Sequence, residues 1–210
     1  MPAPAPEPIA APPPAAFVLG AIPGATPGGW IDAWRERMPQ TELELRTIPV
    51  AMQRDELLEG GLDAAIVRLP FDSAGLHVIP LYDEITVVVV PAESHLTAVD
   101  ELVIADLAGE VVIVPADDVL GLEVPGAAAA SFTPPDDTEQ AIATVAAGVG
   151  IVIVPMSLAR LHRRKDAAYR PLRDGPISSV ALAWPADRTT AEVEAFVGIV
   201  RGRTANSSRS

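Results

Sequence analysis

The feature that most constrains the fold is a regular alternation of strand-like and helix-like segments early in the chain. Three runs have the apolar or alternating pattern of strands, and the two segments between them carry apolar residues at helical spacing. The five segments are residues 17–22, 30–38, 42–48, 54–61 and 63–69. Such a βαβαβ unit forms a parallel sheet with right-handed crossovers. The first half of the chain is therefore predicted to be a Rossmann-like lobe.

The second half has a different order of elements. The apolar runs 76–81 and 85–90 are separated by a segment too short for a crossover helix, so we expect a bend or an antiparallel connection. A helix is predicted over residues 138–147, capped by Asp136 or Asp137. The other predicted elements are strands at 110–114, 127–132, 151–154, 168–172 and 179–184, and helical segments at 102–108, 157–162 and 191–203. Together they predict a second α/β lobe.

Composition excludes several functions. Lys and Arg total 15 against 28 Asp and Glu in the 210 residues, and the resulting net charge of -13 opposes contact with a phosphate backbone. The absence of cysteine rules out disulfides, thiolate catalysis and cysteine-ligated zinc. Because 49% of residues are hydrophobic but only 4% aromatic, we expect an aliphatic core, as in a sheet covered by helices.

The two ends of the chain are predicted to be disordered tails. Residues 1–16 are rich in proline and alanine and lack the basic and uninterrupted apolar regions of a secretory signal. Residues 204–210 are polar and show no periodicity. No apolar run has the length of a membrane span. We therefore expect a cytoplasmic protein without membrane contact, folded over residues 17–203.

Six short segments, taken in order, point to a known family. They are Phe-Val-Leu-Gly-Ala (17–21), Trp-Arg-Glu-Arg-Met-Pro (34–39), Leu-Leu-Glu-Gly-Gly-Leu-Asp-Ala-Ala-Ile (57–66), Gly-Leu-His-Val-Ile-Pro-Leu (75–81), Asp-Leu-Ala-Gly-Glu-Val-Val-Ile-Val-Pro (106–115) and Val-Ala-Ala-Gly-Val-Gly-Ile-Val-Ile-Val-Pro (145–155). In this order and spacing they resemble the effector-binding (substrate-binding) domain of LysR-type transcriptional regulators. The resemblance implies a type 2 periplasmic-binding-protein-like α/β fold, with two Rossmann-like lobes and a small-molecule cleft between them. It places lobe I at residues 17–90 plus 186–203 and lobe II at 91–185.

The same resemblance implies a regulatory role. Members of this family carry an N-terminal winged helix-turn-helix, whereas only the Pro/Ala segment precedes residue 17 here. We therefore expect no direct DNA binding, and action through an effector or through pairing, as a homodimer or as a heteromer with a full-length LysR-type regulator. The expected effector is a small organic anion. The alternatives are a solute-binding protein for transport and an enzyme on the same fold.

Two residues are the leading candidates for holding this effector. Thr26 lies in the turn-rich loop 23–29 before the first helix, where backbone N–H groups and the helix dipole favour an anion. Arg68 ends the third strand, and strand ends of this kind are where open α/β sheets bind ligands. Its guanidinium could hold a carboxylate through two hydrogen bonds. The structural alternatives are that Thr26 caps the helix and that Arg68 forms a surface ion pair, for example with Asp72.

Further candidates follow from the resemblance and from their place in the sequence. Val50 and Gln53, at the start of the second helix, match a contact region of the family, although either could serve packing alone. Phe132 and Thr133 precede the capped helix of lobe II and could close the cleft from that side. Pro155 belongs to a family loop near the cleft, although a role as a strand terminator is the stronger interpretation.

No catalytic constellation stands out. The three histidines, His77, His95 and His162, lie in different elements without metal-ligand spacing, and no nucleophile or phosphate-loop motif occurs. The Gly148-Val-Gly150 pair follows a helix and precedes a strand, the reverse of a dinucleotide-binding loop. The paired acids at 117–118 and 136–137 are interpreted as loop solvation and a helix cap. We therefore expect a protein that is not an enzyme and needs no metal or cofactor.

Overall fold

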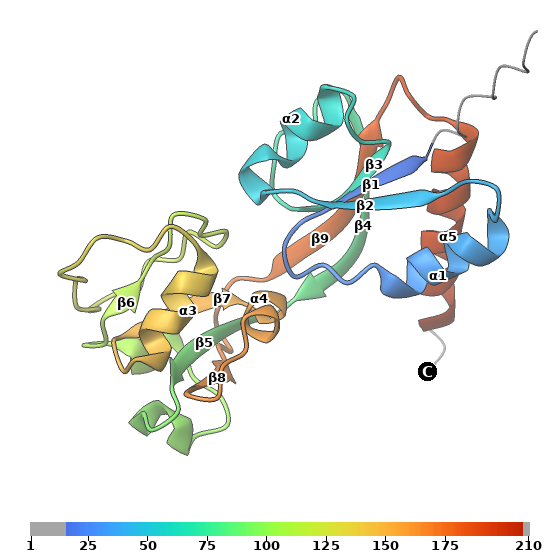
Figure 1. Ribbon diagram of the computed structural model, residues 1–210. Coiled ribbons are helices and arrows are strands. Elements are labelled where there is room, and N and C mark those ends of the chain that lie inside the picture. Colours follow the sequence, from blue (N-terminus) through green and yellow to red (C-terminus); the bar gives the residue numbers. More distant parts are fainter. Residues whose placement is uncertain (1–15, 208–210) are drawn as a thin grey trace, which may run out of the picture.

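The computed structural model describes residues 16–207, so most of the predicted N-terminal tail and the last three residues lie outside the described part. Two separate sheets divide this part into two lobes (Figure 1). The strands are β1 Phe17–Ala21, β2 Leu43–Thr47, β3 Ala64–Arg68, β4 Leu76–Glu84, β5 Thr86–Pro91, β6 Val112–Ile113, β7 Ile151–Pro155, β8 Ala167–Pro171 and β9 Ser178–Pro185. The α-helices are α1 Gly28–Arg37, α2 Gln53–Leu58, α3 Thr138–Ala146, α4 Met156–Leu161 and α5 Ala191–Ser207, and the 3-10 turns are η1 Val50–Met52, η2 His95–Ala98 and η3 Ile104–Leu107.

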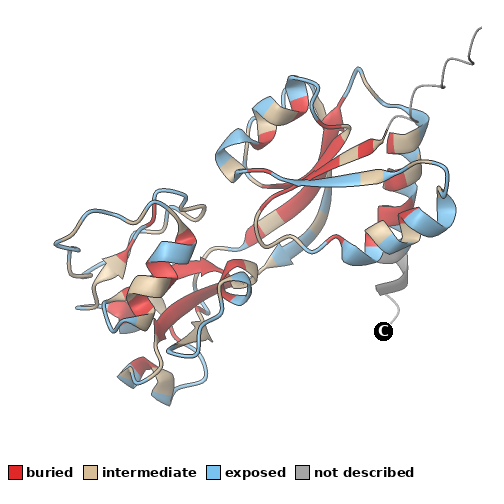
Figure 2. Ribbon diagram, in the orientation of Figure 1, coloured by how far each residue is buried: buried red, intermediate tan, exposed pale blue. Residues whose placement is uncertain are grey.

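Lobe I is built on a five-stranded sheet in the order β2-β1-β3-β9-β4. Strand β1 pairs in parallel with both β2 and β3, which confirms the predicted βαβαβ opening. Helices α1 and α5 cover one face of this sheet, and α2 covers the other. The strand at the outer edge, β2, is exposed along most of its length (Figure 2).

The core of lobe I contains a cluster of three aromatic rings. The ring of Phe17 on β1 lies 4.6 Å from Trp34 on α1 and 5.4 Å from Phe196 on α5, measured between ring centroids. All three side chains are buried, and the indole Nε1 of Trp34 donates to the carbonyl of Thr41 at 2.9 Å. Three aromatic side chains are thus used where two helices meet the first strand, while the rest of the lobe I core is mostly aliphatic, with Trp184 of β9 also buried in it.

Lobe II is built on a four-stranded sheet in the order β6-β7-β5-β8. Helices α3 and α4 pack on one face through Ile142, Val145 and Leu158. The carboxylate of Asp137 accepts from the backbone N–H of Gln140 at 2.8 Å, which confirms the predicted cap of α3. The strand expected at 127–132 is reduced to an isolated bridge between Ala128 and Val111.

The chain crosses between the lobes at two places, and these differ from the expected boundaries. Strand β4 pairs with β9 in lobe I, whereas β5 pairs with β7 and β8 in lobe II, so the runs 76–81 and 85–90 do not form a hairpin. Strand β5 therefore belongs to lobe II and β9 to lobe I. Helix α5 also extends to Ser207, into the segment expected to be a tail. Strands β5 and β9 are both apolar enough to be buried in either sheet, so the sheet that each joins depends on long-range pairing.

Candidate functional site

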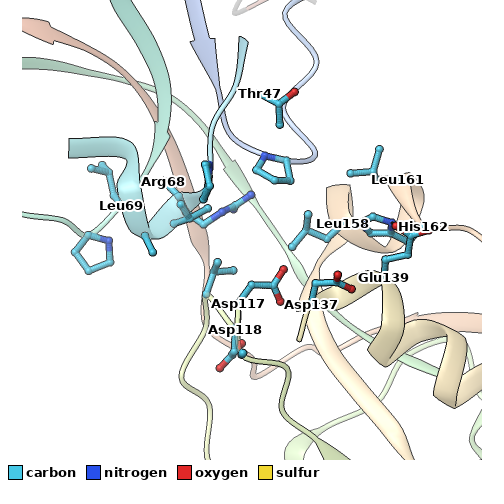
Figure 3. A pocket seen from close by; sticks show the side chains of 17 residues that line it. Thr47, Arg68, Leu69, Asp117, Asp118, Asp137, Glu139, Leu158, Leu161 and His162 are labelled. Carbon is cyan, nitrogen blue, oxygen red and sulfur yellow. The ribbon is translucent and has the colours of Figure 1, made fainter. Parts of the chain in front are cut away.

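A cavity of about 720 Å³ lies between the two lobes. Its lobe I wall is formed by the ends of β2 and β3 and by the turn η1, and its lobe II wall by the loop after β6, the start of α3 and the end of α4. The lining includes Val50 and the charged or titratable side chains of Arg68, Asp117, Asp118, Asp137, Glu139 and His162. Figure 3 labels all of these except Val50. Parallel strands β2 and β3 bring their carboxyl ends to this edge of the sheet, where open α/β sheets bind ligands.

Arg68, the last residue of β3, is the cationic residue of the lobe I wall. Its side chain is only 3% exposed, and its Nη1 donates to Glu84 Oε2 at 2.9 Å and to the hydroxyl of Ser178. Its Nε is buried and has no hydrogen-bond partner among the described residues. The surface ion pair considered for Arg68 with Asp72 is formed instead by Arg54, whose Nε lies 3.2 Å from the Asp72 carboxylate.

Gln53 positions Arg68 and does not line the cavity. Its Nε2 donates to the Arg68 carbonyl at 2.8 Å, and its Oε1 accepts from the Arg68 backbone N–H at 2.9 Å. The side chains of Gln53 and Arg68 are both buried, so these two bonds satisfy backbone groups of Arg68 that water cannot reach. The start of α2 is thereby joined to the end of β3.

The lobe II wall is acidic. Asp117 Oδ1 accepts from the Thr138 hydroxyl at 2.9 Å, while Asp118 accepts from two backbone N–H groups of its own loop. Asp137 caps α3, and Glu139 Oε2 lies 3.9 Å from the imidazole Nδ1 of His162. These carboxylates come from a loop and from a helix start that are separated in sequence but line the same cavity. In Figure 3 the Asp118 carboxylate points away from those of Asp117 and Asp137.

A second cavity of about 560 Å³ lies beside the connection from β4 to β5 and shares Leu161 with the first. It is lined by Thr26, Tyr82, Glu84 and Ser157 among others. Glu84 Oε2, which accepts from Arg68, also accepts from the Ser157 hydroxyl on α4 of lobe II at 2.9 Å. Burial raises the pKa of the Tyr82 phenol, and the nearby Glu84 carboxylate raises it further.

The structure distributes the predicted site residues over several environments. Arg68 and Val50 line the interlobe cavity, and Thr26 lines the second cavity. The remaining candidates line neither: Gln53 holds Arg68, Phe132 packs against the lobe II core, Thr133 is exposed and Pro155 is buried at the end of β7. Their proposed contacts with a ligand stay predictions.

The sequence interpretation missed the acidic wall. The predicted cap is confirmed at Asp137, whereas Asp117 and Asp118, interpreted as loop solvation, accept hydrogen bonds from Thr138 and from their own loop. One sequence feature could have indicated this wall. The acid pairs 117–118 and 136–137 stand at the two ends of the lobe II segment that leads to α3. Among residues 16–207, no set of three or more acidic or histidine side chains is arranged to hold a metal ion. Within the same range, no helix combines the length and apolar character needed to cross a bilayer.

Comparisons with known proteins agree with this architecture. The BenM effector binding domain with its effector benzoate matches with a TM-score of 0.76 at 21% identity, covering 93% of this chain and 95% of that one. The oxidized form of OxyR matches with a TM-score of 0.73 at 22% identity, covering 91% and 97%. At these identities the two structures establish the fold: a two-lobed, type 2 periplasmic-binding-protein-like domain.

The family follows from the sequence comparison. The model of the LysR substrate binding domain matches residues 17–205, and the chain belongs to this family. It is 32% identical over 161 residues to the HTH-type transcriptional regulator CatR of Pseudomonas putida, covering 71% of this chain and 55% of that protein. It is 28% identical over 148 residues to the HTH-type transcriptional regulator AlsR of Bacillus subtilis (strain 168), covering 66% and 49%. The chain thus spans about half the length of these relatives.

Proposed function

We propose that this chain is an effector-binding module of transcriptional regulation, which takes a small organic molecule into the interlobe cavity. The observation that carries the proposal is the cavity itself, because its volume lies in the usual range for small-molecule sites and both lobes contribute to its walls. The named relatives are transcriptional regulators, and the BenM domain of the same fold is described with benzoate as its effector.

An organic acid is the proposed class of effector. Arg68 supports it, because the guanidinium lines the cavity and retains hydrogen-bond donors beyond the Nη1 used by Glu84 and Ser178. The Glu84 carboxylate already compensates the charge of Arg68, so the guanidinium offers directed hydrogen bonds more than net positive charge.

The proposed mode of action is through protein partners in the cytoplasm. The net charge of -13 disfavours contact of these residues with DNA, so the effector signal would pass to a full-length regulator or to a second copy of this chain. We propose a binding role and no catalytic one, in keeping with the regulators among its relatives.

The test is calorimetric titration with a panel of carboxylates, amines, amino acids and neutral polar molecules. The variant Ala51→Trp places a large ring in the cavity wall, and Met52→Trp is its matched control, because Met52 is exposed and does not line the cavity. We expect saturable binding of roughly -4 to -8 kcal/mol in the wild type and the control, and a loss in Ala51→Trp. Equal binding by all three proteins, or no binding across the panel, would overturn the proposal.

A further inference from the structure

The charge distribution of the interlobe cavity narrows the class of its ligand. We propose that the ligand is an aminocarboxylic acid or a close relative: a molecule with an oxygen acceptor for Arg68 and a positively charged nitrogen for the lobe II wall. This inference rests on the function proposed above, since it concerns the same cavity. It joins two independent observations, an acidic wall on one lobe and a buried arginine with unused donors on the other.

The acidic wall carries most of the charge in the cavity. Four carboxylates line it, from Asp117, Asp118, Asp137 and Glu139, and all come from lobe II. Asp117 and Glu139 are exposed side chains, and in each of them one oxygen has no described hydrogen bond or ion pair. These two are therefore the groups best placed to accept from a ligand ammonium.

Positive charge within the lining does not balance these carboxylates. The imidazole of His162 lies 3.9 Å from Glu139, and no other ion pair of His162 is described. Arg160 lines the second cavity, and the basic residues at 163–165 are exposed and outside the lining of the first. A ligand with only negative charge would approach this wall against repulsion, whereas an ammonium group would be attracted.

The lobe I wall of the cavity has hydrogen-bond donors of Arg68 that lack an acceptor. Only 3% of the surface of Arg68 is exposed. Among its three guanidinium nitrogens, only Nη1 has described partners, and these are Glu84 and Ser178. The buried Nε has none. A guanidinium has five N–H donors, and leaving buried donors unpaired is unfavourable. A ligand oxygen in the cavity would supply an acceptor for Nη2, which has no described partner and, unlike Nε, is not fully buried.

The ion pair between Arg68 and Glu84 explains why both ligand charges are needed. A carboxylate ligand alone gains little net attraction from an arginine already paired at 2.9 Å. An amine alone leaves the free donors of Arg68 unpaired. A molecule that carries both groups satisfies both walls and bridges lobe I to lobe II.

The experiment compares four probes that differ only in charged groups: pentanoate, pentylamine, 2-aminopentanoate and 5-aminopentanoate. We expect at least one aminopentanoate to bind more tightly than pentanoate and pentylamine by roughly tenfold. Two amino acids are used because the position of the nitrogen relative to the carboxylate decides which one spans the walls. Titration calorimetry at low and high salt shows whether the preference is electrostatic, since salt weakens such attraction.

The matched variants locate the effect. The double variant Asp117→Asn/Glu139→Gln removes two charges from the wall, and Asp100→Asn/Glu93→Gln removes two exposed charges elsewhere in lobe II. We expect only the first to lose the preference for the amino acid, with pentanoate binding unchanged or tighter. A wild type that prefers pentanoate would overturn this inference and leave the proposed function standing. If neither the four probes nor any compound of the wider panel binds, both this inference and the proposed function are overturned.

Discussion

Arg68 Nη1 lies 2.9 Å from Glu84 Oε2, and this buried ion pair joins the ends of β3 and β4 at the wall between the two cavities. The same Glu84 oxygen accepts from Ser157 of lobe II at 2.9 Å. One carboxylate therefore links the arginine of the candidate ligand site to the opposite lobe. A ligand that attracts the Arg68 guanidinium therefore competes with Glu84, which also holds Ser157 of lobe II.

Replacing Glu84 tests how much its ion pair with Arg68 contributes to the free energy of unfolding. Glu84→Gln leaves the Arg68 guanidinium buried without a compensating charge, and we expect a loss of roughly 3 kcal/mol in the free energy of unfolding. Urea denaturation measures it. Asp83→Asn, next to Glu84 but exposed, is the control and should change stability by no more than about 0.5 kcal/mol. A Glu84→Gln protein as stable as the wild type would show that the pair contributes nothing to folding.

Gln53 is predicted to be essential for the geometry of Arg68. Gln53→Ala leaves the Arg68 backbone N–H and carbonyl without their side-chain partners, which should cost about 2–4 kcal/mol. Thermal and urea unfolding report the loss. Met52→Ala, one residue earlier and exposed, serves as the comparison. Similar stabilities for the two variants would contradict the positioning role.

Gly24 is predicted to set how closely the lobes approach each other. Its φ of +85° lies in the left-handed region, and a Cβ there would lie 2.6 Å from the Ser157 hydroxyl of lobe II. Gly24→Ala should therefore cost about 1–2 kcal/mol in backbone strain and also push the lobes apart. Small-angle scattering would show a larger radius of gyration. An unchanged radius in this variant would contradict the contact between Gly24 and Ser157.

Stability should fall at alkaline pH because of Tyr82. Its pKa is raised in the folded state by burial, with Glu84 adding to the effect, so the folded protein holds the phenol proton more tightly than the unfolded chain. The resulting stabilisation is complete below the unfolded pKa of about 10 and is lost as the pH rises through the folded value. Urea midpoints measured across this range should decline more steeply in the wild type than in Tyr82→Phe. Parallel declines would count against the shift.

Several features were predictable from local sequence patterns. The alternation of periods in residues 17–69 predicted the βαβαβ opening, because periodicity reports which side of an element is buried. The cap at Asp137 was predictable for the same local reason, since a capping carboxylate bonds to its own helix start. The order of the six family segments predicted the two-lobed fold.

Other features depended on contacts between distant residues. The sheets to which β5 and β9 belong are decided by pairing partners, because both strands are apolar enough for either core. Arg68 was identified from its place at a strand end, but its partners Glu84 and Ser178 lie 16 and 110 residues away and meet it only through the crossing strands. The acids at 117 and 139 form one wall for the same reason. Sequence by itself determined the elements, the family and a candidate arginine, whereas the tertiary structure decided which charge compensates that arginine and which charges face it, because electrostatic partners are set by distance in space.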